Sequence, residues 1–191
     1  MILVGPLAAG KSTLGALVAE RIGHPFVDID GIAWTYCAEV GWSLDRLLER
    51  DDAVGWAAAE REWEPARAHA VQRVVEDHPE AVIAFGAGYT SFTGPDHAAR
   101  VRRALAPVPD VVHLLPSLDP ARSVAVLRER AVTSRGKDWM IEGQDWIARW
   151  VADPLAGELA AATLFTDGAS PAESADELVR LRERLLAELA A

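Results

Sequence analysis

The chain lacks the features that mark secreted and membrane proteins. Its single cysteine, Cys37, excludes an internal disulfide and fits a reducing compartment. Because the sequence contains no run of about 18 apolar residues, we expect no transmembrane helix and no membrane partner. An aliphatic, strand-like run begins at Met1, so we also expect no signal or transit peptide and a cytoplasmic location.

Basic residues are fewer than acidic residues. The chain has 19 lysine and arginine residues against 29 aspartate and glutamate residues, which gives a net charge of −10. This charge argues against a nucleic-acid partner held by a general basic surface and is compatible with a small-molecule substrate. Internal repeats and low-complexity tracts are also missing. The 191 residues suffice for one domain with a sizeable core, 1–191, which we expect to be a monomer or a homodimer.

Short aliphatic runs alternate with segments of helical periodicity. The expected strands are 2–4, 25–30, 81–85, 110–115 and 162–166, and the expected helices are 12–22, 44–50, 57–76, 95–105, 120–130 and 170–189. Such alternation predicts an α/β fold with a doubly wound parallel sheet covered on both faces. Ligands of these sheets bind at the carboxyl ends of the strands.

The segment 5–12, GPLAAGKS, fits the Walker A pattern G-x-x-x-x-G-K-[ST] and has the strand–loop–helix context that this motif requires. Backbone amides of the turn and the positive end of the following helix favour phosphate. Lys11 is expected to reach the β- and γ-phosphates of ATP, and the Ser12 hydroxyl to bind Mg²⁺. The full set expected at the nucleotide comprises Gly5, Ala8, Ala9, Gly10, Lys11, Ser12 and Thr13.

Two segments interrupt the alternation of strands and helices, and both would project over the strand ends. We expect 31–61 to bind the substrate and 132–153 to form a lid, because long excursions at this edge often serve these purposes. All seven tryptophans lie in or beside these two segments. They would either pack in the core or line a pocket for a ring-bearing or cationic substrate.

Taken in order, five segments of the chain resemble shikimate kinase and related P-loop small-molecule and nucleoside monophosphate kinases. The segments are LVGPLAAGKSTLGALVAERIGHPFVDID, AEVGWSL, AVGWAAAERE, VIAFGAG and DPLAGELAAATLFTDGASPAESADELV. The resemblance implies a P-loop NTPase fold with a five-stranded parallel sheet and a lid. It also implies an ATP-dependent, Mg²⁺-using kinase that phosphorylates a hydroxyl of a small molecule.

The resemblance assigns roles to particular residues. Asp28 would help to hold the Mg²⁺ shell and Asp30 would bind the accepting hydroxyl, although the two could instead end a strand and cap a turn. Arg135 would meet the transferring phosphate from the lid. Arg128 and the segment 166–171 would flank the adenine. The residues implied to bind the acceptor are Asp30, Trp56, Glu60, Gly86, Ala87, Gly88 and Arg149.

The chain departs from the family where shikimate kinase grips the carboxylate of its substrate. The arginine of the family's Phe-Arg-x-x-Glu segment falls at Ala57 if GWAAAERE is aligned, or at Glu64 if WEPAR is aligned. A second arginine aligns with Ala152, although Arg149 lies one turn earlier. Without a guanidinium fork the bidentate clamp is lost. We therefore expect an acceptor other than shikimate, such as a specialised-metabolite or antibiotic-type alcohol. A nucleoside or nucleotide kinase and a non-transferring regulatory ATPase are the alternatives.

Overall fold

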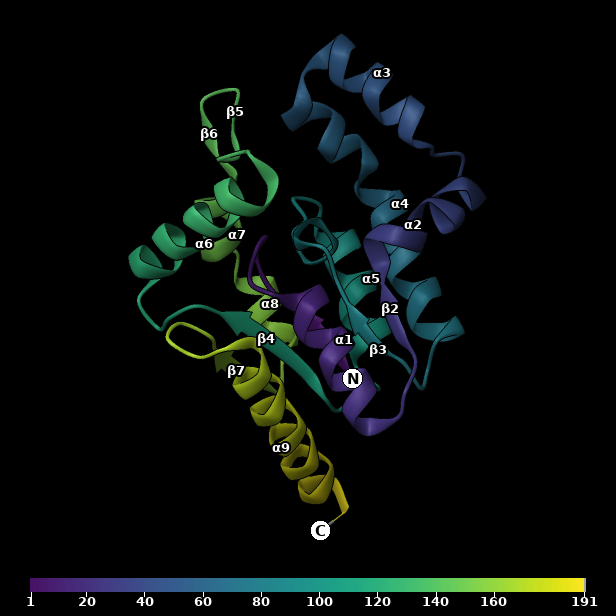
Figure 1. Ribbon diagram of the computed structural model, residues 1–191. Helices are drawn as coiled ribbons and strands as arrows, with labels where there is room; N and C mark the ends of the chain where they lie inside the picture. Colours follow the sequence, from purple (N-terminus) through teal and green to yellow (C-terminus); the bar gives the residue numbers. More distant parts are fainter. Residues whose placement is uncertain (191) are drawn as a thin grey trace.

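A parallel sheet forms the centre of the protein, and residues 1–190 are described by a computed structural model. Its strands are β1 (Ile2–Val4), β2 (Phe26–Asp28), β3 (Val82–Ala84), β4 (Val111–Leu115) and β7 (Ala162–Phe165). They lie in the order β2-β3-β1-β4-β7 and all pair in parallel (Figure 1). The predicted doubly wound α/β fold is confirmed.

Helices bury both faces of this sheet. They are α1 (Lys11–Ile22), α2 (Ile29–Glu39), α3 (Leu44–Val54), α4 (Trp56–Asp77), α5 (Pro95–Leu105), α6 (Pro120–Arg135), α7 (Trp146–Ala152), α8 (Pro154–Leu159) and α9 (Pro171–Ala190), with the 3₁₀ turn η1 (Ala87–Thr90). Successive side chains of β1 enter different cores, since Ile2 packs with α4 and α5 and Leu3 packs with α1 and α9. Among residues 1–190, every helix is too short or too polar to cross a lipid bilayer.

The structure differs from the sequence prediction at several element boundaries. The second strand ends at Asp28 and not at residue 30, because the Asp28 side chain accepts a hydrogen bond from the Asp30 amide (3.1 Å) and caps α2. Helix α6 continues five residues beyond its predicted end, to Arg135, and stops at Gly136 with φ +65°. Between α6 and α7 the chain forms a small hairpin of β5 (Met140–Ile141) and β6 (Gln144–Asp145), which was not predicted.

A buried histidine lies on β4 directly behind the phosphate-binding loop. The His113 side chain is 6% exposed, and its Nε2 atom has no hydrogen-bond partner among the described residues. Burial, together with the nearby Lys11 charge, lowers the pKa of His113 to about 4. The folded protein therefore keeps this ring neutral under conditions in which an unfolded chain would protonate it.

This difference makes the folded state sensitive to acid. Since the folded pKa lies below the unfolded value of about 6.5, stability is fully present above pH 6.5 and is lost as the pH falls towards 4, by roughly 3 kcal/mol from this group. His113→Leu is expected to flatten that part of the pH profile. Urea unfolding between pH 7 and pH 4 measures the free energy of unfolding at each pH, with His97→Leu on α5 as the control. A mutant profile parallel to the wild type would contradict the assignment.

Candidate active site

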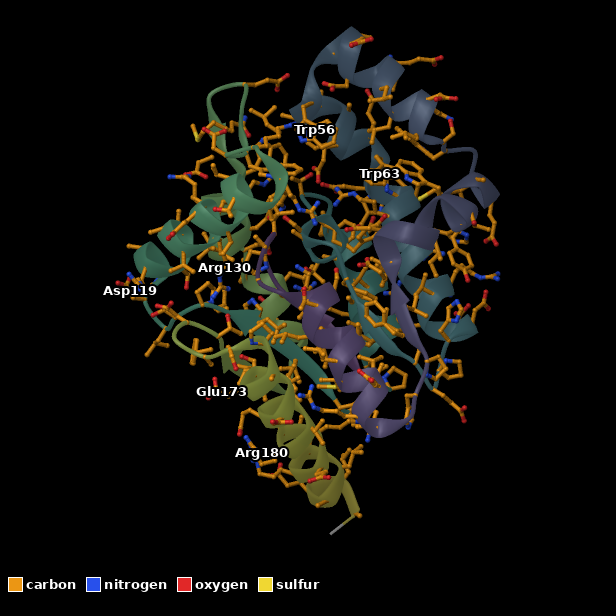
Figure 2. The ribbon with its side chains drawn as sticks, viewed as in Figure 1. Trp56, Trp63, Asp119, Arg130, Glu173 and Arg180 are labelled. Carbon is orange, nitrogen blue, oxygen red and sulfur yellow. The ribbon has the colours of Figure 1, made fainter. Side chains whose placement is uncertain are left out.

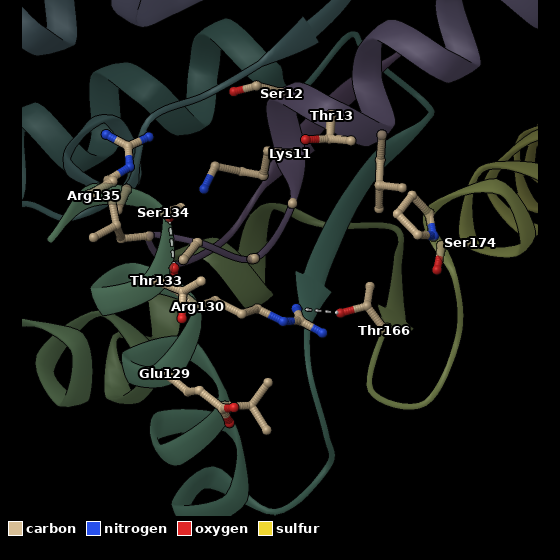
Figure 3. Close-up of a pocket in the computed structure, with 18 of the residues that line it drawn as sticks. Lys11, Ser12, Thr13, Glu129, Arg130, Thr133, Ser134, Arg135, Thr166 and Ser174 are labelled. Carbon is tan, nitrogen blue, oxygen red and sulfur yellow. Dashed lines mark hydrogen bonds between the residues drawn. The ribbon is translucent and has the colours of Figure 1, made fainter. Parts of the chain in front are cut away.

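A cleft of about 1070 Å³ opens at the carboxyl ends of the strands, where such sheets bind their ligands. The loop between β1 and α1 forms its floor, and the last turns of α6 form one wall (Figure 3). The residues that follow β2, β3 and β7 complete the lining. From the predicted nucleotide set, the lining includes Ala8, Ala9, Gly10, Lys11, Ser12 and Thr13; Gly5 lies beneath the loop against the Leu114 carbonyl.

Lys11 occupies the centre of the loop with its side chain folded back on the chain. Its ammonium donates hydrogen bonds to the carbonyl oxygens of Gly5 (2.9 Å) and Pro6 (2.7 Å). Helix α1 begins at Lys11, with Gly10 as its N-cap at φ +93° and no side chain capping it. The first-turn amides of α1 are thus left for a ligand, and the helix dipole favours an anion there.

Charge in the cleft is concentrated around Lys11. Burial lowers the pKa of Lys11 to about 8, although the nearby Asp30 and Asp28 carboxylates oppose this effect. Desolvation, and secondarily the Asp28 charge, raises the pKa of Asp30, while Lys11 and Arg135 act in the other direction. A basic and an acidic group with opposed pKa shifts therefore share one end of the cleft.

Arg122, Arg130 and Arg135 of α6 line the cleft, whereas Arg128 does not. Figure 3 shows Lys11 and Arg135 extending into the same space, while Arg130 reaches across to the Thr166 hydroxyl (3.3 Å). Arg128, predicted beside the adenine, lies outside the cleft because it forms an ion pair with Asp145. Arg130 follows Arg128 by two residues and so lies on another side of the helix.

The shikimate kinase family model matches residues 7–181 of this chain. The shikimate kinase of Stenotrophomonas maltophilia is 30% identical over 184 residues, covering 94% of this chain and 89% of that protein. The chain belongs to the shikimate kinase family. A shikimate kinase of Xanthomonas campestris is 28% identical over 182 residues, with the same coverage.

Solved structures share the fold of this family member. The shikimate kinase from Acinetobacter baumannii in complex with shikimate aligns with a TM-score of 0.66 at 23% identity, covering 96% of this chain and 92% of that one. A gluconokinase from Sinorhizobium meliloti aligns with a TM-score of 0.53 at 18% identity, covering 98% and 95%. The protein is thus an ATP-dependent kinase of the P-loop class, and ATP with Mg²⁺ is its cofactor pair. This finding favours the kinase over the regulatory ATPase alternative.

The side chains of the cleft fit these cofactors. The Ser12 and Thr13 side chains at the start of α1 and the Asp28 side chain at the end of β2 all line the cleft. Hydroxyl and carboxylate oxygens are the hard donors that Mg²⁺ prefers. Asp28 keeps an oxygen for this purpose beyond the one that caps α2. Ser12 and Asp28 are therefore the candidate Mg²⁺ ligands of this shikimate kinase family member.

The predicted acceptor residues divide into two groups. Asp30, Gly86 and Ala87 line the cleft together, and Gly86 lies so close to the Asp30 carboxylate that any side chain there would collide with it. The other four do not line it. Trp56, Glu60 and Gly88 lie along or beside α4, and Arg149 stacks over the Trp146 ring of α7 at 4.6 Å. The sequence prediction grouped them because helical spacing alone does not reveal which side chains packing removes from a cleft.

Arg67 on α4 was missed as a member of the acceptor side. Its guanidinium is fully buried and pairs with Glu60 Oε1 (2.7 Å). It also donates to the backbone carbonyls of Gly88 and Ser91 beneath the glycine turn. Glu64 accepts hydrogen bonds from the Thr93 and Gly94 amides of the same loop (2.7 and 2.9 Å). These buried charges hold the loop that carries Gly86, and they keep the Arg67 guanidinium out of the cleft.

Six of the seven tryptophans pack in two clusters, which meet α4 at Trp63 and at Trp56, and Trp42 lies against the Arg46 guanidinium. Trp34 and Trp63 stack at 5.0 Å between α2 and α4, and Trp63 meets the edge of Tyr89. The second cluster joins Trp56 to the α6–α7 region through Trp146, Trp150 and Trp139. Within the described chain no tryptophan lines the cleft, so the packing alternative accounts for their positions and the aromatic pocket gains no support.

The shifted pKa of Lys11 predicts how ATP binding depends on pH. The free protein loses the Lys11 charge above about pH 8, whereas bound phosphates retain it, so the Kd for ATP should rise above pH 8 by up to about tenfold per pH unit. Lys11→Met should weaken binding and abolish this slope. Calorimetric titration between pH 6.5 and pH 9.5 measures both effects. Lys137→Met, at the one other lysine, should behave as the wild type, and a retained slope in Lys11→Met would contradict the assignment.

Proposed function

We propose that this kinase transfers the γ-phosphoryl group of ATP to a hydroxyl of a small metabolite that carries no carboxylate, and that shikimate is not its preferred acceptor. A neutral polyol or an amine-bearing alcohol, for example a specialised-metabolite or antibiotic-type compound, fits this description. The observation that carries the proposal is the charge on the acceptor side of the cleft. There, neither alignment places a guanidinium group where a carboxylate-binding enzyme needs one.

Both alignments of the missing arginine support this reading. If the position is Ala57, its backbone amide already binds the Glu142 carboxylate at 3.3 Å. If the position is Glu64, the residue is itself a carboxylate, buried against the loop that follows Gly88. In either case the position offers an acceptor carboxylate no guanidinium group, and a missing charge-assisted hydrogen bond discriminates between ligands.

Neither Arg67 nor Arg149 compensates for the loss. Arg67 is fully buried beneath the glycine turn, held by Glu60 and two backbone carbonyls. Arg149 lies over the Trp146 ring, and the aligned position one turn later is Ala152. Moving Arg67 into the cleft would leave Glu60 as an unpaired buried carboxylate, which is costly.

The residues of the cleft have distinct parts in the proposed reaction. When bound, ATP supplies the phosphoryl group and Mg²⁺ neutralises charge on the phosphates. Lys11 turns from the loop carbonyls to the β- and γ-phosphates, and Asp30 accepts a hydrogen bond from the attacking hydroxyl and orients it. Arg135 offsets the negative charge that grows on the transferred group. We assign 31–61 to the acceptor side and 132–153 to a lid that excludes water.

Asp30→Asn separates the orienting role from nucleotide binding. The amide keeps the size of the side chain but cannot accept the proton of the hydroxyl, so the rate of transfer should fall on the order of 10²–10⁴-fold while the Kd for ATP changes little. Single-turnover kinetics and ATP titration measure the two quantities. Glu129→Gln, at another carboxylate of the cleft wall, is the matched control. Lost ATP affinity with unchanged turnover of the bound complex would instead assign Asp30 to the metal shell.

The acceptor preference can be tested with shikimate and its methyl ester, in which a methyl group replaces the negative charge of the carboxylate. Two missing charge-assisted hydrogen bonds, each worth roughly 1.5–3 kcal/mol, should make the acid a poor acceptor by about a hundredfold or more relative to an enzyme with the clamp. We expect the ester to match or exceed the acid in kcat/KM, measured by coupled ADP release. Efficient phosphorylation of the acid, with the ester much weaker, would show that a carboxylate clamp exists.

A further inference from the structure

The tip of the β5–β6 hairpin is bonded to the first turn of α4, a helix more than 80 residues earlier in the chain. Glu142 accepts a hydrogen bond from the Trp56 amide at 2.8 Å through Oε1 and from the Ala57 amide at 3.3 Å through Oε2. Figure 1 shows the hairpin beside the start of α4, and Figure 2 shows Trp56 at that junction. The contact joins 132–153 to the acceptor side of the cleft.

Helix α4 depends on this contact for its N-terminal cap. Its own N-cap residue is Gly55, which offers no side chain, whereas α2, α3, α6, α7 and α8 are capped by an adjacent aspartate or serine. Uncapped amides at the start of a 22-residue helix attract a carboxylate through hydrogen bonding and the helix dipole. Glu142 supplies the cap from a distant part of the chain.

The backbone on both sides is shaped for this approach. Gly55 has φ +81°, and a Cβ atom there would collide with the Glu142 carboxylate. Glu142 itself has φ +54° and is followed by Gly143 at φ +74°, so two successive left-handed residues form the hairpin tip. A non-glycine residue in the left-handed region costs about 1 kcal/mol or more. This conformation persists only where the surrounding structure stabilises it.

The hairpin packs with α6 and α7 as one unit. Asp145 caps α7 and pairs with Arg128 of α6, and the Trp139 and Trp150 rings meet at 5.4 Å. A second contact reaches α4 from this unit, since the Trp56 and Trp146 rings meet edge to face at 6.3 Å. Opening the cleft between the unit and α4 must therefore break the Glu142 hydrogen bonds and separate these two rings.

We propose that Glu142 is a positioning and specificity-determining residue that clasps 132–153 to α4. The clasp holds closed the wall from which Arg135 enters the cleft. It also fills the helix end at Ala57 with a carboxylate of the protein itself, so an acceptor carboxylate finds that end occupied. This inference rests on the proposed function for its kinetic consequences, but the clasp itself can be measured without turnover.

Tryptophan fluorescence of the free protein tests the clasp directly. Trp146 is 1% exposed and Trp150 is 8% exposed with the clasp formed, so release should admit a neutral quencher such as acrylamide. We expect Glu142→Ala to raise the Stern–Volmer constant by about 1.5-fold or more, with Glu142→Gln between it and the wild type because the amide accepts at one oxygen only. Gln144→Ala, an exposed position of the same hairpin, should leave the constant unchanged.

Quenching equal to the wild type in a folded Glu142→Ala variant would overturn the clasp. If circular dichroism shows that this variant is unfolded, Glu142→Gln decides by the same criterion, because it keeps the size of the side chain. An equal rise in Gln144→Ala would also overturn the proposal, since it would reflect general loosening of the hairpin.

Kinetics test the consequence for catalysis. Glu142→Ala should increase acceptor-independent ATP hydrolysis by about threefold or more, because an open wall admits water, and should raise the acceptor KM more than it lowers kcat. It should also narrow the preference for the methyl ester over shikimate. Unchanged hydrolysis and an unchanged preference would overturn the specificity role. If the wild type transfers phosphate to no acceptor, the proposed function fails while the quenching result still decides the clasp.

Discussion

The buried Lys11 ammonium is the charge on which the arrangement of the cleft depends. A cation removed from water must be met by oxygen atoms, and in the free protein the Gly5 and Pro6 carbonyls meet it. Asp30 and Asp28 lie close enough to influence its protonation, and Arg135 faces it from α6. Phosphate oxygens can replace the loop carbonyls without leaving the ammonium unpaired. The desolvation that lowers the pKa of Lys11 in the free protein therefore also favours binding of a polyphosphate ligand.

The acceptor side shows a different use of charge. In this chain, Arg67, Glu60 and Glu64 of α4 point inward and hold the loop between Gly86 and Gly94. Their burial makes the loop rigid and removes them from ligand binding. Helix α4 thus positions the glycine turn. Asp30 and the end of α6 bound the adjoining part of the cleft, and in our proposal Glu142 holds the α6 wall in place.

The elements whose patterns are local could be predicted from the sequence. The five aliphatic runs became the five parallel strands, and the Walker segment became the loop and helix start that it indicates. Helix α2 was not predicted because it follows β2 without a connecting loop. Asp28 is both the last residue of the strand and the N-cap of the helix. The β5–β6 hairpin was missed because its strands have two residues each and are held by contacts to α4 and α7 rather than by their own propensity.

The sequence alone determined the family, the phosphate-binding lysine and the residue types available at the cleft, because motif spacing is a property of the chain. Only the tertiary structure decided which of those side chains reach the cleft. Arg128 and Arg130 differ by two residues, yet one pairs with Asp145 and the other lines the cleft, since a helix turns their directions apart. Glu142 and Trp56 lie 86 residues apart, and no local pattern relates them. Their contact exists because packing of α6 and α7 brings the hairpin tip to an uncapped helix end.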